Sequence, residues 1–399
     1  MQLNIAKLHQ WLLALFVFLI PLHQGFSTLA LLLLTLVSLI PYKDNSFYRY
    51  FNQSWDSWIY FGLLALGLLY TSDLTMGLRV LQTNLSLIAM PIVFTRIYPF
   101  TSRVTKFLCN AFCAGLTVAL VYSLLVSANY FSTGGDWREF LGDKFTSHLD
   151  NTHPVYFAYY IIFAITYGLY NIYYGELKLS RIWLSLFVIF MFFMILLTGS
   201  GTAIIGLLFS LLYFVLKFAF EESRDISKTT AFLISVSLLS GLLMASYNEV
   251  LGFGYEDYWE RFVLWKSAVY ALPDWIFGVG TGDYIAVLNQ YYRTHDLGFF
   301  AASNYNPHNQ FIEVFFSIGV PGLAALSIML IRPIYLAVRS QTIIGFLGLF
   351  PFLAYGITEV FLGRFQGVVF FALLQQIFIS ESFTTRSTSK LVLMTRNQT

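Results

Sequence analysis

Apolar runs long enough to cross a membrane recur along almost the whole chain. A membrane-spanning helix needs roughly 20 mostly apolar residues, because each backbone polar group must be bonded within the helix. The composition agrees with this pattern, since 57% of the 399 residues are hydrophobic and only 11% are charged. Water-soluble folds rarely have such a composition. The predicted fold class is therefore all-α, a polytopic integral membrane protein.

The positions of the apolar runs predict about twelve membrane-spanning helices. The predicted spans are residues 9–22, 26–41, 55–70, 78–95, 104–128, 154–174, 181–198, 201–220, 229–247, 309–331, 341–358 and 364–381. No cleavable signal peptide is predicted, because the first run leads into the second without a small-residue cleavage site. Since no long linker or clear repeat interrupts the runs, residues 1–382 are predicted to form one membrane domain, followed by a polar cytoplasmic tail at residues 383–399.

Basic residues give the orientation of these spans, because cytoplasmic loops carry an excess of Lys and Arg. With the N-terminus inside, only seven of the 23 Lys and Arg residues fall on the external side. These seven are Arg79, Arg138, Lys144, Arg261, Lys266, Arg293 and Arg364. The asymmetry favours an even number of spans with both termini in the cytoplasm. The external basic residues then need another reason for their position.

Two external segments are longer than turns, residues 129–152 and the main loop at residues 248–308. Within the main loop, residues 255–271 have the spacing of an amphipathic helix that lies along the membrane surface. Its apolar side is predicted to hold Trp259, Phe262, Trp265 and Val269. Asp257, Arg261 and Lys266 are predicted on its other faces. Next comes a glycine-rich turn, residues 278–283 (GVGTGD), whose backbone N–H groups are suited to binding an anion.

The centre of the chain's polar chemistry is residues 306–310 (NPHNQ), at the end of this loop. Asn306 is predicted as the N-cap of the next membrane helix and Pro307 as its first residue. His308 then lies in the first helical turn, where the positive end of the helix dipole favours a neutral imidazole that can accept a proton. A histidine at the membrane boundary can also be a solvated surface residue, and position alone leaves both interpretations open.

Several classes of function have no support in the sequence. The formal net charge of +2 gives no reason to expect a nucleic-acid partner. Cys109 and Cys113 lie one turn apart on an apolar segment, and we interpret them as small core residues, because no further Cys or Cys/His pair completes a disulfide or metal site. No metal ion and no cofactor are therefore expected.

The predicted span interiors contain almost no ionisable side chains. Ion-coupled transporters usually place such groups near the middle of the membrane. Here the charged and polar groups collect on the external face instead. This distribution suits a site that handles a polar head group while a lipid tail rests between the helices.

A set of motifs in the last third of the chain resembles the shared signature of the O-antigen ligase and O-antigen polymerase family, over about residues 195–331. The set comprises Arg261, Trp265, Pro273, GVGTGD at 278–283, NPHNQ at 306–310 and GVPGL at 319–323. TEVFLGRFQG at 358–367 and HPVYF at 153–157 also resemble segments of Bacteroidetes-type members. Together these motifs are more specific than any one of them.

The resemblance implies a metal-independent, inverting glycosyltransferase in the bacterial inner membrane. Its site would face the periplasm, its donor would be an undecaprenyl-pyrophosphate-linked glycan, and its acceptor would be lipid A-core or another glycan. Position and resemblance together make His308 the candidate general base and Arg261 the main candidate for stabilising the departing pyrophosphate. The other candidate substrate-binding residues are Arg79, Arg293, Arg364, His153, Asn309 and Glu359.

Structural interpretations stand beside these assignments. Arg261 could pair with Asp257 one turn earlier, Glu359 and Arg364 could form a pair that closes the last external turn, and His153 could serve only as a helix-entry residue. Lys266, His148 and His295 match no motif. One departure concerns residues 198–202 (TGSGT), where many relatives carry a Ser-Arg pair. Either another external arginine replaces that one at the Gly201 turn, or the donor is bound differently.

Three further functions compete with ligation of a polysaccharide to lipid A-core. An O-antigen polymerase and a protein O-oligosaccharyltransferase would use the same donor with a different acceptor. The sequence does not distinguish between these enzymes, because the loops that recognise the acceptor contain no motif that identifies it. A lipid-linked glycan flippase or transporter is disfavoured by the neutral span centres.

Overall fold

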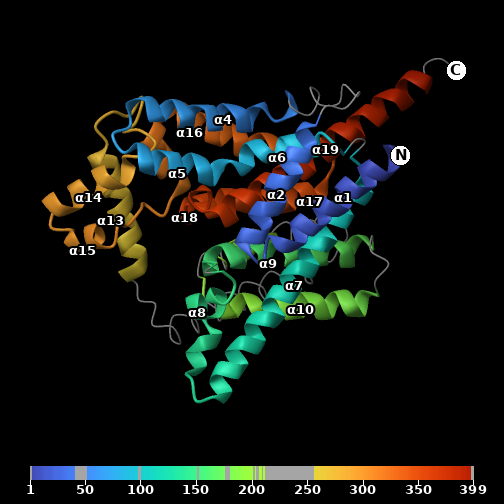
Figure 1. Ribbon diagram of the computed structural model, residues 1–399, viewed down its shortest axis with the longest axis horizontal. Helices are drawn as coiled ribbons and strands as arrows, with labels where there is room; N and C mark the ends of the chain where they lie inside the picture. Colours follow the sequence, from blue (N-terminus) through green and yellow to red (C-terminus); the bar gives the residue numbers. More distant parts are fainter. Residues whose placement is uncertain are drawn as a thin grey trace, which may run out of the picture.

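The computed structural model describes residues 2–40, 52–97, 100–150, 152–175, 180–200, 203, 206–208, 210–211 and 256–396. Every element within these residues is a helix. Most of the long helices run side by side in one bundle, and α7 crosses it at an angle (Figure 1). The first and last helices end at one side of the bundle, whereas α13, α14 and α15 cover its opposite end (Figure 1). This arrangement agrees with two termini on the same side of a membrane.

The bundle helices follow the predicted spans closely. They are α1 (Gln2–Leu19), α2 (Gln24–Leu39), α4 (Trp55–Leu66) with η1 (Gly67–Tyr70), α5 (Leu74–Asn84), α6 (Ser86–Phe94), α7 (Ser102–Ser132), α9 (Pro154–Tyr174), α10 (Arg181–Leu197), α16 (Gln310–Arg339), α17 (Ile343–Leu349), α18 (Pro351–Thr358) and α19 (Phe365–Arg396). Among the described residues, five helices are long and apolar enough to cross a membrane. The predicted spans 201–220 and 229–247 lie largely outside the described residues, and the total of about twelve stays a prediction.

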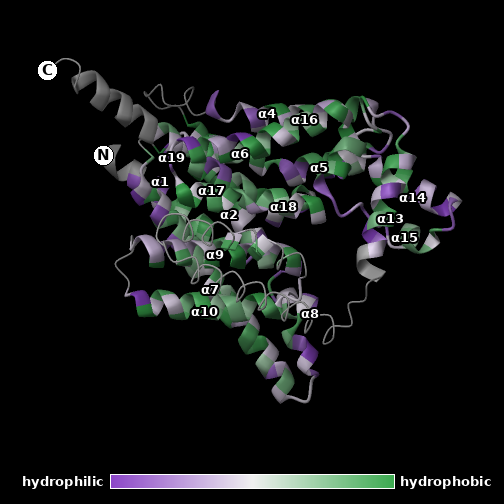
Figure 2. Cartoon of the chain, turned by 180° about the vertical axis from the view of Figure 1, so that it is seen from behind, coloured by the Kyte–Doolittle hydropathy of each residue, from purple (hydrophilic) through white to green (hydrophobic). Residues whose placement is uncertain are grey.

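The centre of the bundle is formed by α9 and α19. In the most apolar window of each, 78% and 89% of the residues are buried, against 44% in α7. A helix that is apolar all round belongs in a core. Aromatic rings join the two helices, with Tyr160 and Phe370 centroids 4.7 Å apart. Hydrophilic residues collect at the bundle ends and over the outer helices (Figure 2).

Three short helices in the loop predicted to be external form an outer unit, α13 (Glu256–Ala271), α14 (Tyr284–Thr294) and α15 (Gly298–Ala302). They enclose a small core of their own that includes Leu264, Leu288 and Tyr292. Trp259 and Phe262 of α13 are exposed as predicted. The Trp265 ring packs against that of Phe262, with the ring centroids 5.5 Å apart, and its ring nitrogen donates to a carbonyl of the loop before α16. The other segment predicted to be external, residues 129–152, contains η2 (Trp137–Phe140) and α8 (Gly142–Ser147).

The glycine-rich segment at residues 278–283 is a packed junction, and its predicted role as an anion-binding turn is wrong. The N–H groups of Gly278, Val279, Gly280, Thr281 and Gly282 donate, in that order, to Asp274 O, Phe316 O, Ser317 O, Gly67 O and Thr71 Oγ1. The carboxylate of Asp283 accepts from the N–H groups of Ser72 and Asp73 at 2.7 and 2.8 Å. Because every one of these donors is already bonded, none is free to bind an anion.

The junction fits into a break in α16. Pro321 has no N–H group to donate to the carbonyl of Ser317, so that carbonyl is free to accept from the loop. The N–H group of Val320 donates instead to the carbonyl of Trp275 at 3.1 Å. At the break Gly319 has φ +64°, and a Cβ there would lie 2.0 Å from the carbonyl oxygen of Ile276. Only glycine permits this approach, and the outer unit is thereby fixed to the membrane helix.

Candidate active site

The bundle end beneath the outer unit brings together His308 and Glu359, which are 51 residues apart in the chain. His308 Nδ1 lies 2.9 Å from Glu359 Oε1 and 3.1 Å from Oε2. The Glu359 side chain is 9% exposed and that of His308 is 32% exposed. The carboxylate is therefore enclosed by protein, while the imidazole still reaches the outside.

The local fold that presents His308 differs from the prediction. The N-cap of α16 is Asn309 and not Asn306, because the Asn309 side chain accepts from the N–H groups of Phe311 and Ile312 at 3.0 Å. His308 thus precedes the helix and has φ +43°. Its own N–H group donates to Asn306 Oδ1 at 2.8 Å. A positive φ in a residue other than glycine is uncommon and is often found at functional sites.

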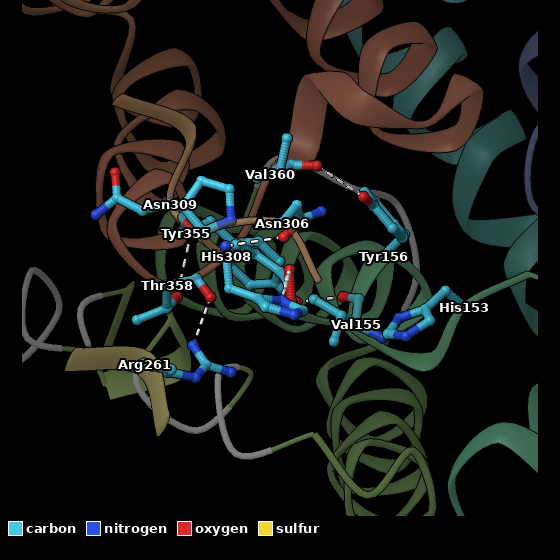
Figure 3. A network of polar contacts seen from close by, with 12 residues as sticks. His153, Val155, Tyr156, Arg261, Asn306, His308, Asn309, Tyr355, Thr358 and Val360 are labelled. Atoms are coloured by element: carbon cyan, nitrogen blue, oxygen red, sulfur yellow. Dashed lines mark hydrogen bonds and ion pairs between the residues drawn. The ribbon is translucent and has the colours of Figure 1, made fainter. Parts of the chain in front are cut away.

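The turn between α18 and α19 that carries Glu359 is held by bonds from several elements. Asn309 Nδ2 donates to the carbonyl of Ile357 at 3.0 Å, and the Tyr156 hydroxyl of α9 donates to the carbonyl of Val360 at 2.7 Å (Figure 3). The N–H group of Leu362 donates to Gln310 Oε1 at 2.7 Å. Because backbone groups on both sides of Glu359 are fixed, its carboxylate is positioned before any ligand arrives.

Helix α13 contributes two side chains one turn apart. Arg261 Nη1 donates to the carbonyl of Thr358, at the C-terminal end of α18 (Figure 3). Trp265 Nε1 donates to the carbonyl of Pro307 at 2.8 Å. Residues four apart lie on the same face of a helix. One face of α13 therefore bonds both Thr358, which precedes Glu359, and Pro307, which precedes His308. The side chain of Asp257 lies outside the described part, and the suggested Arg261–Asp257 pair stays untested.

Positive charges outweigh burial at Glu359. Burial alone raises the pKa of this carboxyl, but the hydrogen bond from His308 and the charges of His308, Arg261 and His153 lower it below its ordinary value. The carboxylate is therefore ionised at neutral pH and accepts the proton of His308 Nδ1. When the imidazole is neutral, the other ring nitrogen, Nε2, carries a lone pair. It forms no hydrogen bond with any described residue.

His153 lies beside this pair and serves as the N-cap of α9. Its Nδ1 accepts from the N–H group of Val155 at 3.4 Å, which bears out the helix-entry interpretation. Burial and the charge of Arg364 lower the pKa of His153. Arg364 itself is exposed at the start of α19 and forms no ion pair with Glu359. The suggested Glu359–Arg364 pair is wrong, since Glu359 pairs with His308.

The remaining candidates are not joined to the pair by any bond within the described residues. Arg79 is exposed on α5, and Arg293 is exposed near the end of α14. The amide of Asn309 is used on both sides by the protein, as the cap of α16 and as the donor to Ile357. Trp265 is a site residue whose role the sequence analysis missed. Its spacing of four residues from Arg261 was the available signal.

Residues 186–327 match a family model described as O-Antigen ligase. This match supports assignment of the chain to the O-antigen ligase family. No curated protein matches the chain. The O-antigen ligase match contains Arg261, Trp265 and His308, and it ends before Glu359 and Arg364. The family supports ligase-type or polymerase-type activity on lipid-linked glycans in general, and together with the apolar helices it indicates a multi-pass membrane protein.

The candidate site has the two components of a general base, an imidazole and a carboxylate that positions it. Nε2 of His308 is free to take a proton, and Nδ1 is held by a carboxylate that fixes the ring and stabilises the imidazolium that forms. Arg261 stands on the other side of the same turn as a fixed positive charge. The arrangement therefore combines a proton acceptor with a cation suited to a phosphate group.

Proposed function

We propose that the protein is a glycosyltransferase of the O-antigen ligase type. It transfers a polysaccharide from an undecaprenyl-pyrophosphate carrier to a hydroxyl group of lipid A-core at the periplasmic face of the bacterial inner membrane. The observation that carries this proposal is the His308–Glu359 pair, with Nδ1 2.9 Å from the carboxylate and Nε2 free. The family match over residues 186–327 supports the class of reaction.

The proposed reaction is a single displacement. The acceptor oxygen attacks the anomeric carbon of the donor from the side opposite the pyrophosphate, and its proton passes to His308 Nε2. The bond between the anomeric carbon and the pyrophosphate oxygen breaks, and the electron pair leaves with the pyrophosphate. Because the attack comes from the opposite face, the configuration at the anomeric carbon is inverted. Glu359 stabilises the resulting imidazolium through Nδ1.

Charge on the leaving group is balanced by arginine in this proposal, and no metal ion takes part. Arg261 is half-buried and fixed to the carbonyl of Thr358 by one nitrogen, which leaves the rest of its planar fork for pyrophosphate oxygens. Arg364 and His153 lie within electrostatic range of each other next to Glu359. Arg364 is the proposed replacement for the arginine missing at the Gly201 turn.

Purified protein with a synthetic lipid-linked donor and a lipid A-core acceptor tests the proposal. His308→Ala should bind the donor yet transfer on the order of 10²- to 10⁴-fold more slowly, because the general base is lost. His308→Gln separates catalysis from packing, since glutamine can keep the hydrogen bond to Glu359 but cannot take the proton. Substantial turnover by His308→Gln would remove His308 as the base. EDTA should leave the wild-type rate unchanged.

Deletion of the gene, followed by gel analysis of surface glycans, tests the acceptor. A ligase predicts loss of polymer from lipid A-core and accumulation of polymer on the carrier. Single repeats on lipid A-core would indicate a polymerase, and loss of glycan from proteins would indicate an O-oligosaccharyltransferase. Either of the last two results would replace the acceptor proposed above.

A further inference from the structure

A short row of aromatic rings leads from His308 to the surface of the outer unit. The ring centroids of His308 and Tyr305 are 6.0 Å apart, and those of Tyr305 and Phe299 are 5.9 Å apart. Tyr305 is half-buried, and Phe299 of α15 is 65% exposed. The row therefore begins at the candidate base and ends in solvent.

The backbone holds Tyr305 firmly in this row. Its N–H group donates to the carbonyl of Phe300 at 3.1 Å, and its carbonyl accepts from the Tyr292 hydroxyl at 3.5 Å. The preceding residue, Asn304, is fixed by Asn289, whose Nδ2 donates to Asn304 Oδ1 at 2.6 Å. The ring edge of Phe300 packs against Tyr305 at 5.4 Å. The ring is thus positioned by protein contacts that do not involve its hydroxyl group.

Packing alone does not account for two features of the row. The Tyr305 hydroxyl donates to no described residue, so a phenylalanine would fill the same space. Phe299 exposes a large apolar ring although Phe300, its neighbour, fills the small core. A partly exposed aromatic face with an unused hydroxyl group beside it matches a sugar ring. The C–H groups of one sugar face stack on an aromatic ring, and its hydroxyl groups hydrogen-bond at the rim.

We propose that Tyr305 and Phe299 form a subsite for the sugar rings of the glycan acceptor. The proposal rests on the function proposed above, because His308 defines where the reacting hydroxyl must be. That hydroxyl lies within about 3 Å of Nε2 when its proton is transferred, so the sugar that carries it must reach the neighbouring ring of Tyr305. The next sugar of the acceptor then lies against Phe299. The subsite selects a glycan acceptor over a protein hydroxyl.

Kinetics of the purified full chain test the subsite, with deacylated core oligosaccharide as the soluble acceptor probe. Phe299→Ala and Tyr305→Phe should each raise KM for this acceptor by about 2- to 10-fold. KM for the lipid-linked donor and kcat should stay unchanged. Phe277→Ala is the matched control, since Phe277 is 60% exposed and lies outside the row. An unchanged acceptor KM in both variants, or a rise in the donor KM alone, would overturn the proposal.

Binding without turnover separates this proposal from the catalytic one. The same oligosaccharide should bind the inactive His308→Ala protein, measured by ligand-observed NMR, and should bind His308→Ala/Phe299→Ala more weakly by the same factor. Equal binding by the two proteins, or no binding by either, refutes the subsite. If His308→Ala turns over normally while Phe299→Ala loses acceptor binding, the base assignment fails and the sugar subsite stands.

Discussion

Replacing Glu359 with glutamine tests whether the carboxylate acts through His308. The change keeps the size of the side chain and its place among the bonds from Asn309, Tyr156 and Gln310 to the turn. It removes the negative charge that lies 2.9 Å from His308 Nδ1. If Glu359 stabilises the imidazolium, proton transfer to Nε2 becomes harder and the transfer rate falls.

The expected size follows from the hydrogen bond. A hydrogen bond that involves a charged group contributes about 1.5–3 kcal/mol, and each 1.36 kcal/mol of barrier is tenfold in rate. Glu359→Gln should therefore slow transfer by roughly 10- to 150-fold. KM for the donor should change little, because the arginines remain. The effect should stay smaller than that of His308→Ala, since the base itself is kept.

The pH dependence gives the assay its second readout. Burial raises the pKa of the Glu359 carboxyl, but the hydrogen bond from His308 and the nearby positive charges lower it below its ordinary value. The wild-type carboxylate therefore stays ionised from neutral pH down to the ordinary carboxyl range, and glutamine removes a charge that is present at every pH from 5 to 9. The loss of transfer in Glu359→Gln should accordingly be seen across this whole range.

Single-turnover transfer from the synthetic donor, measured from pH 5 to 9, provides the data. Glu139→Gln is the matched control, because Glu139 is also a carboxylate paired with a cation, Lys144 at 2.7 Å. A Glu359→Gln rate within about twofold of wild type, or a loss of rate confined to one end of the pH range, refutes the positioning role. Equal losses in Glu359→Gln and Glu139→Gln would point to general destabilisation instead.

Three further predictions concern the charges and the topology. Arg261→Lys keeps a positive charge but loses the planar guanidinium group, so transfer should fall roughly 10-fold or more. The control Arg293→Lys should transfer at a near-normal rate. Normal transfer by Arg261→Lys would mean that Arg261 serves only to bond α18. His153 has a lowered pKa, so its contribution to stability is present above the ordinary imidazole pKa of about 6.5 and is lost as pH falls. Asparagine can still cap α9 but has no titrating group. In detergent, His153→Asn should therefore melt at similar temperatures at pH 5 and pH 7, whereas wild type should melt at a lower temperature at pH 5. Equal acid sensitivity of the two proteins would show that His153 is not the cause. A single cysteine at Asp296 should react with an impermeant reagent from outside and one at Gln341 should not; the reverse result would overturn the orientation.

The bundle was predictable from the sequence because apolar length is a local property. The predicted span 154–174 coincides with α9 (Pro154–Tyr174), whose ends carry a His153 cap and Gly175. The start of α16 was missed by three residues. Asn306 and Asn309 are both good caps from local preference, and only the packing of the Glu359 turn, through Asn309 Nδ2, selects the second.

The candidate site was predictable only in part, because its bonds join residues far apart in the chain. Single residues such as His308 and Arg261 stood out as external charged groups. The pairing of His308 with Glu359 spans 51 residues, and no local pattern encodes it. The prediction that the glycine-rich segment binds an anion was wrong for a related reason. No local pattern shows that its backbone donors are bonded, because all but that of Gly278 donate to acceptors in residues 67–71 and 316–317.

The junction at the break of α16 limits which segments can be exchanged between related proteins without loss of the fold. The outer unit is joined to the bundle through backbone groups of residues 67–73, 275–283 and 316–320, together with the side chains of Thr71 and Asp283. A graft of residues 256–308 alone would therefore carry Trp265 and His308 into a bundle whose carbonyls and glycines are arranged for another loop. A chimera that aims to alter acceptor choice has to transplant all three segments together. Phe299 and Tyr305 are the smaller alternative, because their exposed surfaces are separate from that junction.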